Sequence, residues 1–107
     1  MVRGRKKEYK SVPAKEVKKM QVEIKCNPDK AFVAVDGASL SSIKDLARAL
    51  ETMSDDTFYY HVTDFKNDFH NWVKDVFKEE ELAEKMLKAR TKERHIIVLL
   101  KYLLENK

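Results

Sequence analysis

Apolar and polar side chains alternate near the N-terminus, and a period of two is typical of a half-buried strand. The apolar positions of this alternation are Met20, Val22, Ile24 and Cys26. Turn-forming residues follow at 27–30, and a second apolar run occupies residues 31–35. The pattern predicts a β-hairpin over residues 20–35.

From residue 42 onward the apolar residues recur at helical spacing. Ser42 with Asp45 resembles a capping box, while Ser54 and Thr91 stand where N-caps of later helices are expected. The pattern predicts helices over residues 42–53, 55–62, 68–77, 79–89 and 92–105. Because two strands alone are marginally stable, the hairpin must pack on these helices. We expect an α+β, mainly helical fold, with an N-terminal β-hairpin packed on a bundle of about five short helices.

Aromatic residues are concentrated in one stretch, residues 58–77, which holds four of the five Phe, two of the four Tyr and the only Trp. Large rings bury the most apolar area per residue. We therefore expect this stretch to form the centre of the core.

The last predicted helix carries apolar residues on more than one stripe. Ile96, Leu100, Leu103 and Leu104 form one stripe, and Val98, Leu99 and Tyr102 widen it. The ordinary interpretation is a central helix packed on two sides. The alternative is a homodimer or partner-docking face over residues 96–104, with Leu99 exposed.

Length and composition favour one folded domain. The chain has 107 residues, of which 43% are hydrophobic and 37% charged. The single Cys26 excludes an internal disulfide, and no apolar segment of signal-peptide type follows Met1. The longest apolar run, residues 96–100, is far shorter than the ~20 residues that span a bilayer. We expect a cytoplasmic protein with no membrane association.

Positive charge is concentrated at the N-terminus. Residues 1–30 hold ten Lys and Arg and four acidic side chains, which gives a net charge of +6. The remaining residues hold twelve Lys and Arg and fourteen acidic side chains, which gives a net charge of −2. Residues 1–13 lack apolar periodicity, and we expect a disordered basic arm over residues 1–16 and a single globular domain over residues 17–107. This asymmetry points to a polyanionic partner.

The aromatic stretch also contains the most recognisable motif of the sequence. Tyr-Tyr-His-Val at 59–62 is followed by Asn-Asp-Phe at 67–69, by Trp72 and by Leu-Ala at 82–83. This pattern resembles a small prokaryotic domain family of unknown function, numbered 5752. The resemblance covers about residues 32–104 and excludes the arm. It implies no catalytic or binding residue.

One cluster has the composition of a metal site. His61, Asp64, Asp68 and His70 lie within ten residues, and imidazole with carboxylate suits zinc or iron. They lack a fixed helical spacing, however, so the ordinary interpretation is that Asp68 caps a helix and His61 bonds at a helix terminus. With two Gly in the chain, glycine-rich phosphate loops are excluded. We expect no enzymatic activity, metal or cofactor.

The basic residues carry the functional hypothesis. Lys and Arg neutralise phosphates, and Tyr9 among them offers a ring for stacking on an unpaired base. We expect binding of structured RNA, as a ribosome-associated protein that contacts rRNA; the alternatives are a protein–protein adapter, then a chromatin-type DNA-binding protein. The candidate nucleic-acid-binding residues are Arg3, Arg5, Lys6, Lys7, Tyr9, Lys10, Lys15, Lys18, Lys19, Lys85, Lys88, Arg90, Lys92 and Arg94.

Overall fold

The structure is a computed structural model that describes residues 25–106, and it confirms a mainly helical α+β fold. The predicted arm, residues 1–16, lies outside this range and stays a prediction. In chain order the elements are η1 (Pro28–Lys30), β1 (Phe32–Val33), β2 (Ser39–Leu40), α3 (Ile43–Thr52), α4 (Asp55–His61), α5 (Asp68–Phe77), α6 (Glu80–Lys88) and α7 (Lys92–Glu105).

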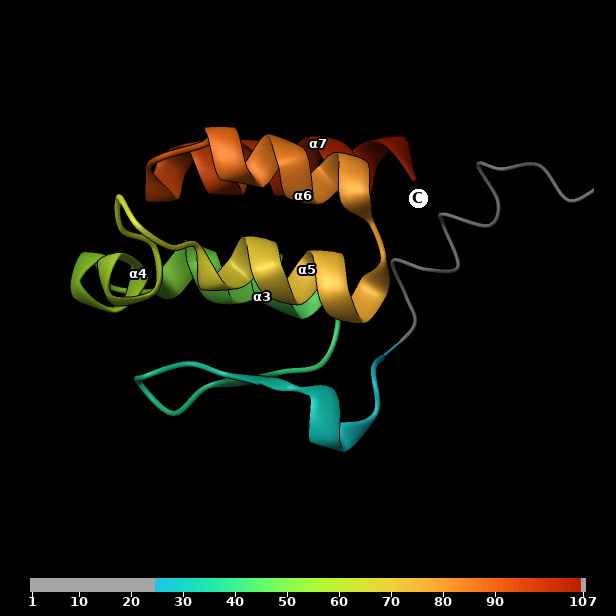
Figure 1. The fold of residues 1–107 in the computed structure, drawn as a ribbon, viewed down its shortest axis with the longest axis horizontal. Helices are drawn as coiled ribbons and strands as arrows, with labels where there is room; N and C mark the ends of the chain where they lie inside the picture. Colours follow the sequence, from blue (N-terminus) through green and yellow to red (C-terminus); the bar gives the residue numbers. More distant parts are fainter. Residues whose placement is uncertain (1–24, 107) are drawn as a thin grey trace, which may run out of the picture.

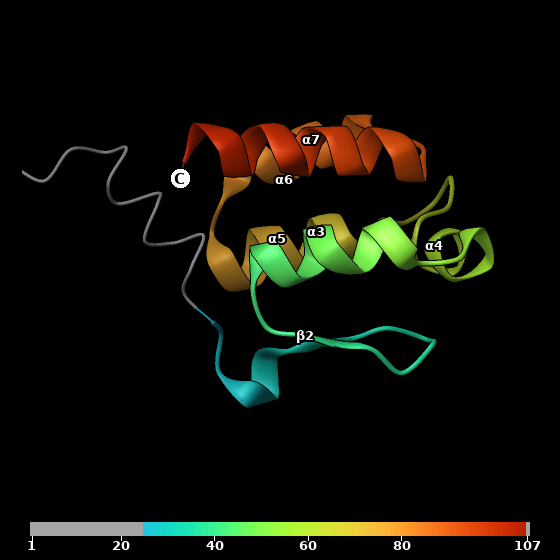
Figure 2. The same cartoon turned by 180° about the vertical axis from the view of Figure 1, so that it is seen from behind.

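The elements form three layers (Figures 1 and 2). The pair α6 and α7 makes one outer layer, α3 and α5 make the middle layer with α4 at its end, and the β1–β2 hairpin makes the other outer layer. Among residues 25–106, no helix combines the length and the apolar character that crossing a membrane requires.

Side-chain caps explain where the helices begin. The hydroxyl of Ser42 accepts a hydrogen bond from the amide of Asp45 at 3.0 Å, and Ser54 and Thr91 cap α4 and α7 in the same way. Each cap satisfies a backbone N–H that has no partner within its helix. All five predicted helices are confirmed, to within one residue at each end.

The aromatic stretch supplies the centre of the core only in part, because Tyr59, Tyr60 and Phe65 are exposed. Phe58 and Phe69 are fully buried, and Trp72 is nearly so. The ring of Phe32 in β1 lies 5.0 Å from that of Phe69 and 5.7 Å from that of Trp72. The indole N–H of Trp72 donates to the carbonyl of Lys30 at 2.8 Å. Ring packing and this hydrogen bond together hold the hairpin against α5.

The predicted hairpin over residues 20–35 is wrong in its pairing, because the strand at 31–35 was expected to pair with the stretch before it and instead pairs with the stretch after it. β1 pairs with β2, so that Phe32 stands opposite Leu40, and the connecting turn contains Gly37 with a φ of 95°. The predicted turn at 27–30 instead holds η1, in which Pro occupies the first position. Residues 20–24 lie outside the described residues. The positive φ of Gly37, which glycine adopts without strain, lets the chain reverse between β1 and β2.

The buried face of α7 also differs from the prediction. Its buried residues are His95, Leu99 and Tyr102, and Leu99 is fully buried instead of exposed. Leu100 and Leu104, assigned to the core stripe, are 41% and 66% exposed. α7 packs on both α3 and α6, as the two-sided interpretation requires. The stripe was misplaced because its centre includes a polar side chain, His95, that an apolar pattern does not count.

One buried polar network joins the three C-terminal helices. The side-chain oxygen of Asn67 accepts from the amide of His70 at 2.9 Å and thereby caps α5. Its amide nitrogen lies 3.4 Å from the carbonyl of Met86 and 3.2 Å from Nε2 of His95. Since that nitrogen donates, His95 is neutral and carries its proton on Nδ1, which lies 3.2 Å from the carbonyl of Thr91.

Replacing Asn67 with Ala should lower the free energy of unfolding by about 2 to 4 kcal/mol, because the cap is lost and buried polar groups of α6 and α7 lose a partner. Urea denaturation measures the change. Asn71→Ala, at an exposed position of the same helix, is the matched control and should change stability by less than about 0.5 kcal/mol. Equal effects of the two substitutions would contradict the role of the network.

Stability should also fall when His95 is protonated. Burial lowers the pKa of His95 below its usual 6.5, so the unfolded chain binds the proton more tightly than the folded chain. Stability is therefore complete above pH 6.5 and is lost as the pH falls below it, by up to about 1.4 kcal/mol between pH 7.5 and 5.5. Urea titrations at the two pH values measure the difference in the free energy of unfolding. His95→Gln should make this difference smaller, and an unchanged difference would exclude His95 as its source.

Candidate nucleic-acid interface

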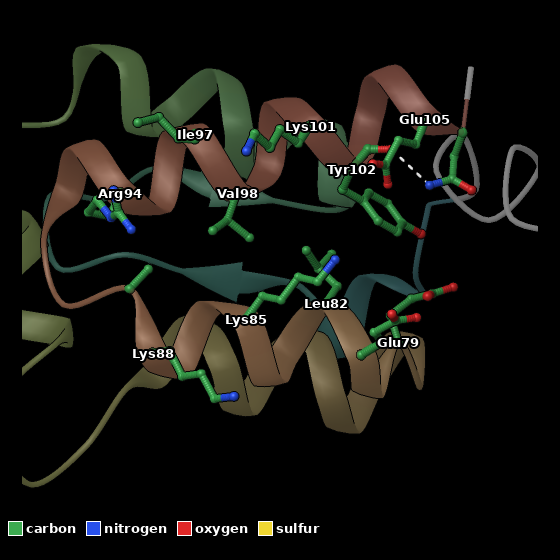
Figure 3. A pocket seen from close by; sticks show the side chains of 13 residues that line it. Glu79, Leu82, Lys85, Lys88, Arg94, Ile97, Val98, Lys101, Tyr102 and Glu105 are labelled. Carbon is green, nitrogen blue, oxygen red and sulfur yellow. Dashed lines mark hydrogen bonds between the residues drawn. The ribbon is translucent and has the colours of Figure 1, made fainter.

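A groove runs between α6 and α7 on the surface of the molecule (Figure 3). It has a volume of about 380 Å³. Its apolar lining includes Leu82 from α6, Ala89 after α6, and Ile97, Val98 and Tyr102 from α7. These side chains lie there because each faces the neighbouring helix, so that the groove follows the seam between two packed helices.

Four cations line this groove. Lys85 and Lys88 come from the last turn of α6, Arg94 from the first turn of α7, and Lys101 from two turns further on. All four are exposed, and none forms an ion pair with another residue of the described range 25–106. Unpaired cations keep their full attraction for an external anion.

The charge along the groove is graded. Lys88 and Arg94 lie beside the connection between the two helices, whereas Glu79 and Glu105 lie at the opposite end (Figure 3). Glu81 also lines the groove. An anionic ligand would therefore be attracted to the end beside the α6–α7 connection.

Helix stability explains some of these cations and not others. Lys85 and Lys88 sit in the last turn of α6, where a positive charge interacts favourably with the helix dipole. Arg94 sits in the first turn of α7, where the same dipole disfavours a cation. The position of Arg94 is thus unfavourable to its own helix, which favours a role in binding.

The structure divides the predicted cluster over residues 85–94. Lys85, Lys88 and Arg94 come together in the groove. Arg90 points elsewhere and pairs with Asp64 at 2.6 Å. Lys92 is largely buried, since it pairs with Asp55 at 3.0 Å and donates to the carbonyl of Met53 at 2.8 Å.

Lys101 was missed by the sequence analysis. It lies seven residues after Arg94, a spacing that places two side chains on the same face of a helix. That spacing is the signal that identifies it. The other predicted binding residues lie outside the described residues and stay predictions: Arg3, Arg5, Lys6, Lys7, Tyr9, Lys10, Lys15, Lys18 and Lys19.

Tyr102 adds a hydrogen-bonding group at the acidic end of the groove. Its hydroxyl is buried and lies close to the carboxylate of Glu79, although no hydrogen bond of good geometry joins it to another residue of the range 25–106. Burial, followed by the negative charge of Glu79, raises the pKa of Tyr102 well above its usual value. The hydroxyl therefore stays protonated and keeps its capacity to donate.

The four residues considered for a metal site have other partners. His61 accepts from the amide of Val35 through Nε2 at 3.0 Å, and its Nδ1 lies 3.0 Å from the carboxylate of Asp68. Nδ1 of His70 lies 2.7 Å from the carbonyl of Ala83, and Asp64 pairs with Arg90.

Within residues 25–106, no group of three or more His, Cys, Asp or Glu side chains has the arrangement to hold a metal ion. The interpretation of Asp68 as a cap is wrong, because Asn67 caps α5. Asp68 instead bonds His61 and Lys66.

Comparison with known proteins yields one match. Residues 32–104 match the model of a family described as "Family of unknown function (DUF5752)". The chain has no significant match among the curated proteins or among the solved structures.

Proposed function

The chain belongs to the DUF5752 family, and since the function of that family is unknown, we propose from the chain's own charge and geometry that it binds structured RNA. In this proposal it is a non-catalytic, cytoplasmic, ribosome-associated protein that contacts rRNA. The supporting observation is the α6–α7 groove, in which Lys85, Lys88, Arg94 and Lys101 lie exposed without ion-pair partners in the described range.

The groove suits a phosphate backbone. Each Lys or Arg that contacts a phosphate releases condensed counterions, so affinity rises with the number of contacts. Arg94 offers a planar fork for phosphate oxygens, and the lysines add mobile point charges. The excess of +6 in residues 1–30 supplies further attraction for the same polyanion.

Duplex DNA fits this surface less well. Readers of the DNA major groove usually present a polar helix face to the base edges. The exposed face of α7 carries Ile97, Leu100 and Leu104, and the buried face of α6 packs on α5 and α7. The described helices therefore favour a backbone-directed mode of binding over reading of duplex sequence.

Removing two groove cations should weaken RNA binding and lower its salt dependence. For Lys88→Ala with Arg94→Ala, we expect the slope of log K against log salt to fall in magnitude by about 2, one for each lost phosphate contact. Fluorescence anisotropy with a labelled rRNA hairpin, over a range of salt concentrations, measures this slope.

The matched control is Lys44→Ala with Lys74→Ala, which removes the same charge from exposed positions outside the groove. Equal slopes for the two double variants would remove the groove from the binding surface. Sedimentation of a lysate of the source organism through sucrose gradients gives a second readout. Wild-type protein should migrate with a ribosomal subunit at low salt and leave it at high salt.

The adapter function is a second candidate, and one observation favours it. Ile97, Leu100 and Leu104 are 45%, 41% and 66% exposed, and their spacing places them on one face of α7. An exposed aliphatic stripe of this kind is typical of helix–helix association. The occupant in this candidate is a second copy of the chain.

For this second candidate, Leu100→Gln with Leu104→Gln should convert a dimer into a monomer while changing the free energy of unfolding by less than about 1 kcal/mol, because both side chains are exposed. Sedimentation velocity gives the mass. Leu99→Gln is the contrasting variant: it buries a polar amide at a fully buried position and should therefore destabilise the fold itself. A monomeric wild-type protein at high concentration would reject the homodimer.

A further inference from the structure

Phe65 is the most exposed large hydrophobic residue in the described range. It lies in the turn between α4 and α5 with 96% of its surface exposed. No ring contact joins it to another aromatic residue among residues 25–106. A bare aromatic ring contributes little to folding, whereas burial against a ligand stabilises a complex. Folding alone therefore does not account for Phe65.

The turn that presents Phe65 is held in place. The amide of Thr63 donates to the carbonyl of Lys66 at 2.9 Å, and the amide of Phe65 donates to the hydroxyl of Thr63 at 3.1 Å. Arg90 pairs with Asp64 at 2.6 Å and ties the turn to the α6–α7 connection. Because the backbone that carries Phe65 is fixed before binding, only the side-chain rotamer has to be ordered when a ligand stacks on the ring.

A hollow of about 450 Å³ lies beside this ring. His70 and Asn71 line it from the first turn of α5. With Nδ1 of His70 at 2.7 Å from the carbonyl of Ala83, the neutral ring leaves Nε2 as an acceptor. The side-chain amide of Asn71 offers both a donor and an acceptor. Such groups match the edges of a nucleobase.

The hollow and the cationic groove approach each other at the C-terminal end of α6. Ala89, directly after α6, lines both. The turn between α4 and α5 rises toward the α6–α7 layer in both views (Figures 1 and 2). Lys88, which has no ion-pair partner in the described range, lines the groove at this end, while Lys66 and Arg90 line the hollow in ion pairs with Asp68 and Asp64. A single chain of phosphates can therefore pass from the groove to the hollow along the C-terminal end of α6.

We infer that the hollow beside Phe65 is a site for one unpaired nucleobase, which stacks on the Phe65 ring while His70 and Asn71 meet its edge. This inference rests on the proposed RNA binding and specifies it: the ligand is RNA with a single-stranded segment next to the phosphates held by the α6–α7 groove. Stacking tolerates any base because every base has a π face.

The surroundings of Phe65 favour a base over a protein side chain. Hot-spot pockets of protein interfaces are apolar and depleted of charge at their centre. Here the neighbours lining the hollow include Asp64, Lys66 and Arg90, and besides Phe65 its apolar lining consists of Val62, Leu87 and Ala89.

Binding of matched RNA hairpins to the full chain tests the inference. One labelled hairpin has a loop of adenosines, and the other has the same loop with abasic residues, which keep the phosphates and lack the bases. Phe65→Ala should weaken binding of the adenosine loop about tenfold and leave the abasic loop unchanged. Phe65→Trp should bind as the wild type does, whereas Phe65→Leu, apolar without a π face, should behave like Phe65→Ala.

The outcomes separate this inference from the proposal beneath it. If the wild type binds the adenosine hairpin and Phe65→Ala binds it equally well, the stacking site is refuted and RNA binding stands. If the wild type binds neither hairpin, both are refuted. If Phe65→Leu keeps full affinity, or Phe65→Ala weakens both hairpins equally, the ring does not stack on a base. Because Phe65 is almost fully exposed, each variant should fold, and circular dichroism checks this.

Discussion

Asn67 imposes the constraint on which the arrangement of the helices depends. A single side chain caps α5 through its oxygen and faces groups of α6 and α7 through its nitrogen. It is 6% exposed, so each of these polar groups is removed from water and must be satisfied within the protein. The network fixes how α5, α6 and α7 approach one another, and therefore fixes the width of the α6–α7 groove and the direction of the turn that precedes α5.

The sequence predicts the helices well because their signals are local. A cap such as Ser42 or Thr91 bonds an amide three residues away, so the start of the helix is contained in a short window. Strand pairing carries no such local signal. The alternation before residue 27 has the correct period, but the partner of β1 is decided by Gly37 and by the ring contacts of Phe32 with α5. His95 shows the same limit, because the partners of its buried ring, Asn67 and Phe58, are 28 or more residues away in sequence.

The candidate site is predictable only in part for the same reason. The cluster over residues 85–94 is visible in the sequence, but which cations remain available depends on distant carboxylates. Asp64 and Asp55 occupy Arg90 and Lys92, and neither is a neighbour in sequence. Phe65 was counted among the core aromatics because composition does not distinguish a ring at a turn from a ring on a buried helix face. For the cations of residues 85–94 and for the aromatic residues of 58–77 alike, the position of a side chain in the fold, and not its residue type, decides whether it is available for binding.

Trp72 gives the protein a built-in optical reporter. It is the only Trp of the chain, and its indole N–H bonds the carbonyl of Lys30 while its ring packs on Phe32. Release of the hairpin from α5 would expose the indole to water even if the helices stayed folded. The intrinsic fluorescence of the protein is therefore sensitive to detachment of the hairpin, whereas the far-ultraviolet circular dichroism follows the helices. Disagreement between the two signals during unfolding would reveal that the layers separate in succession.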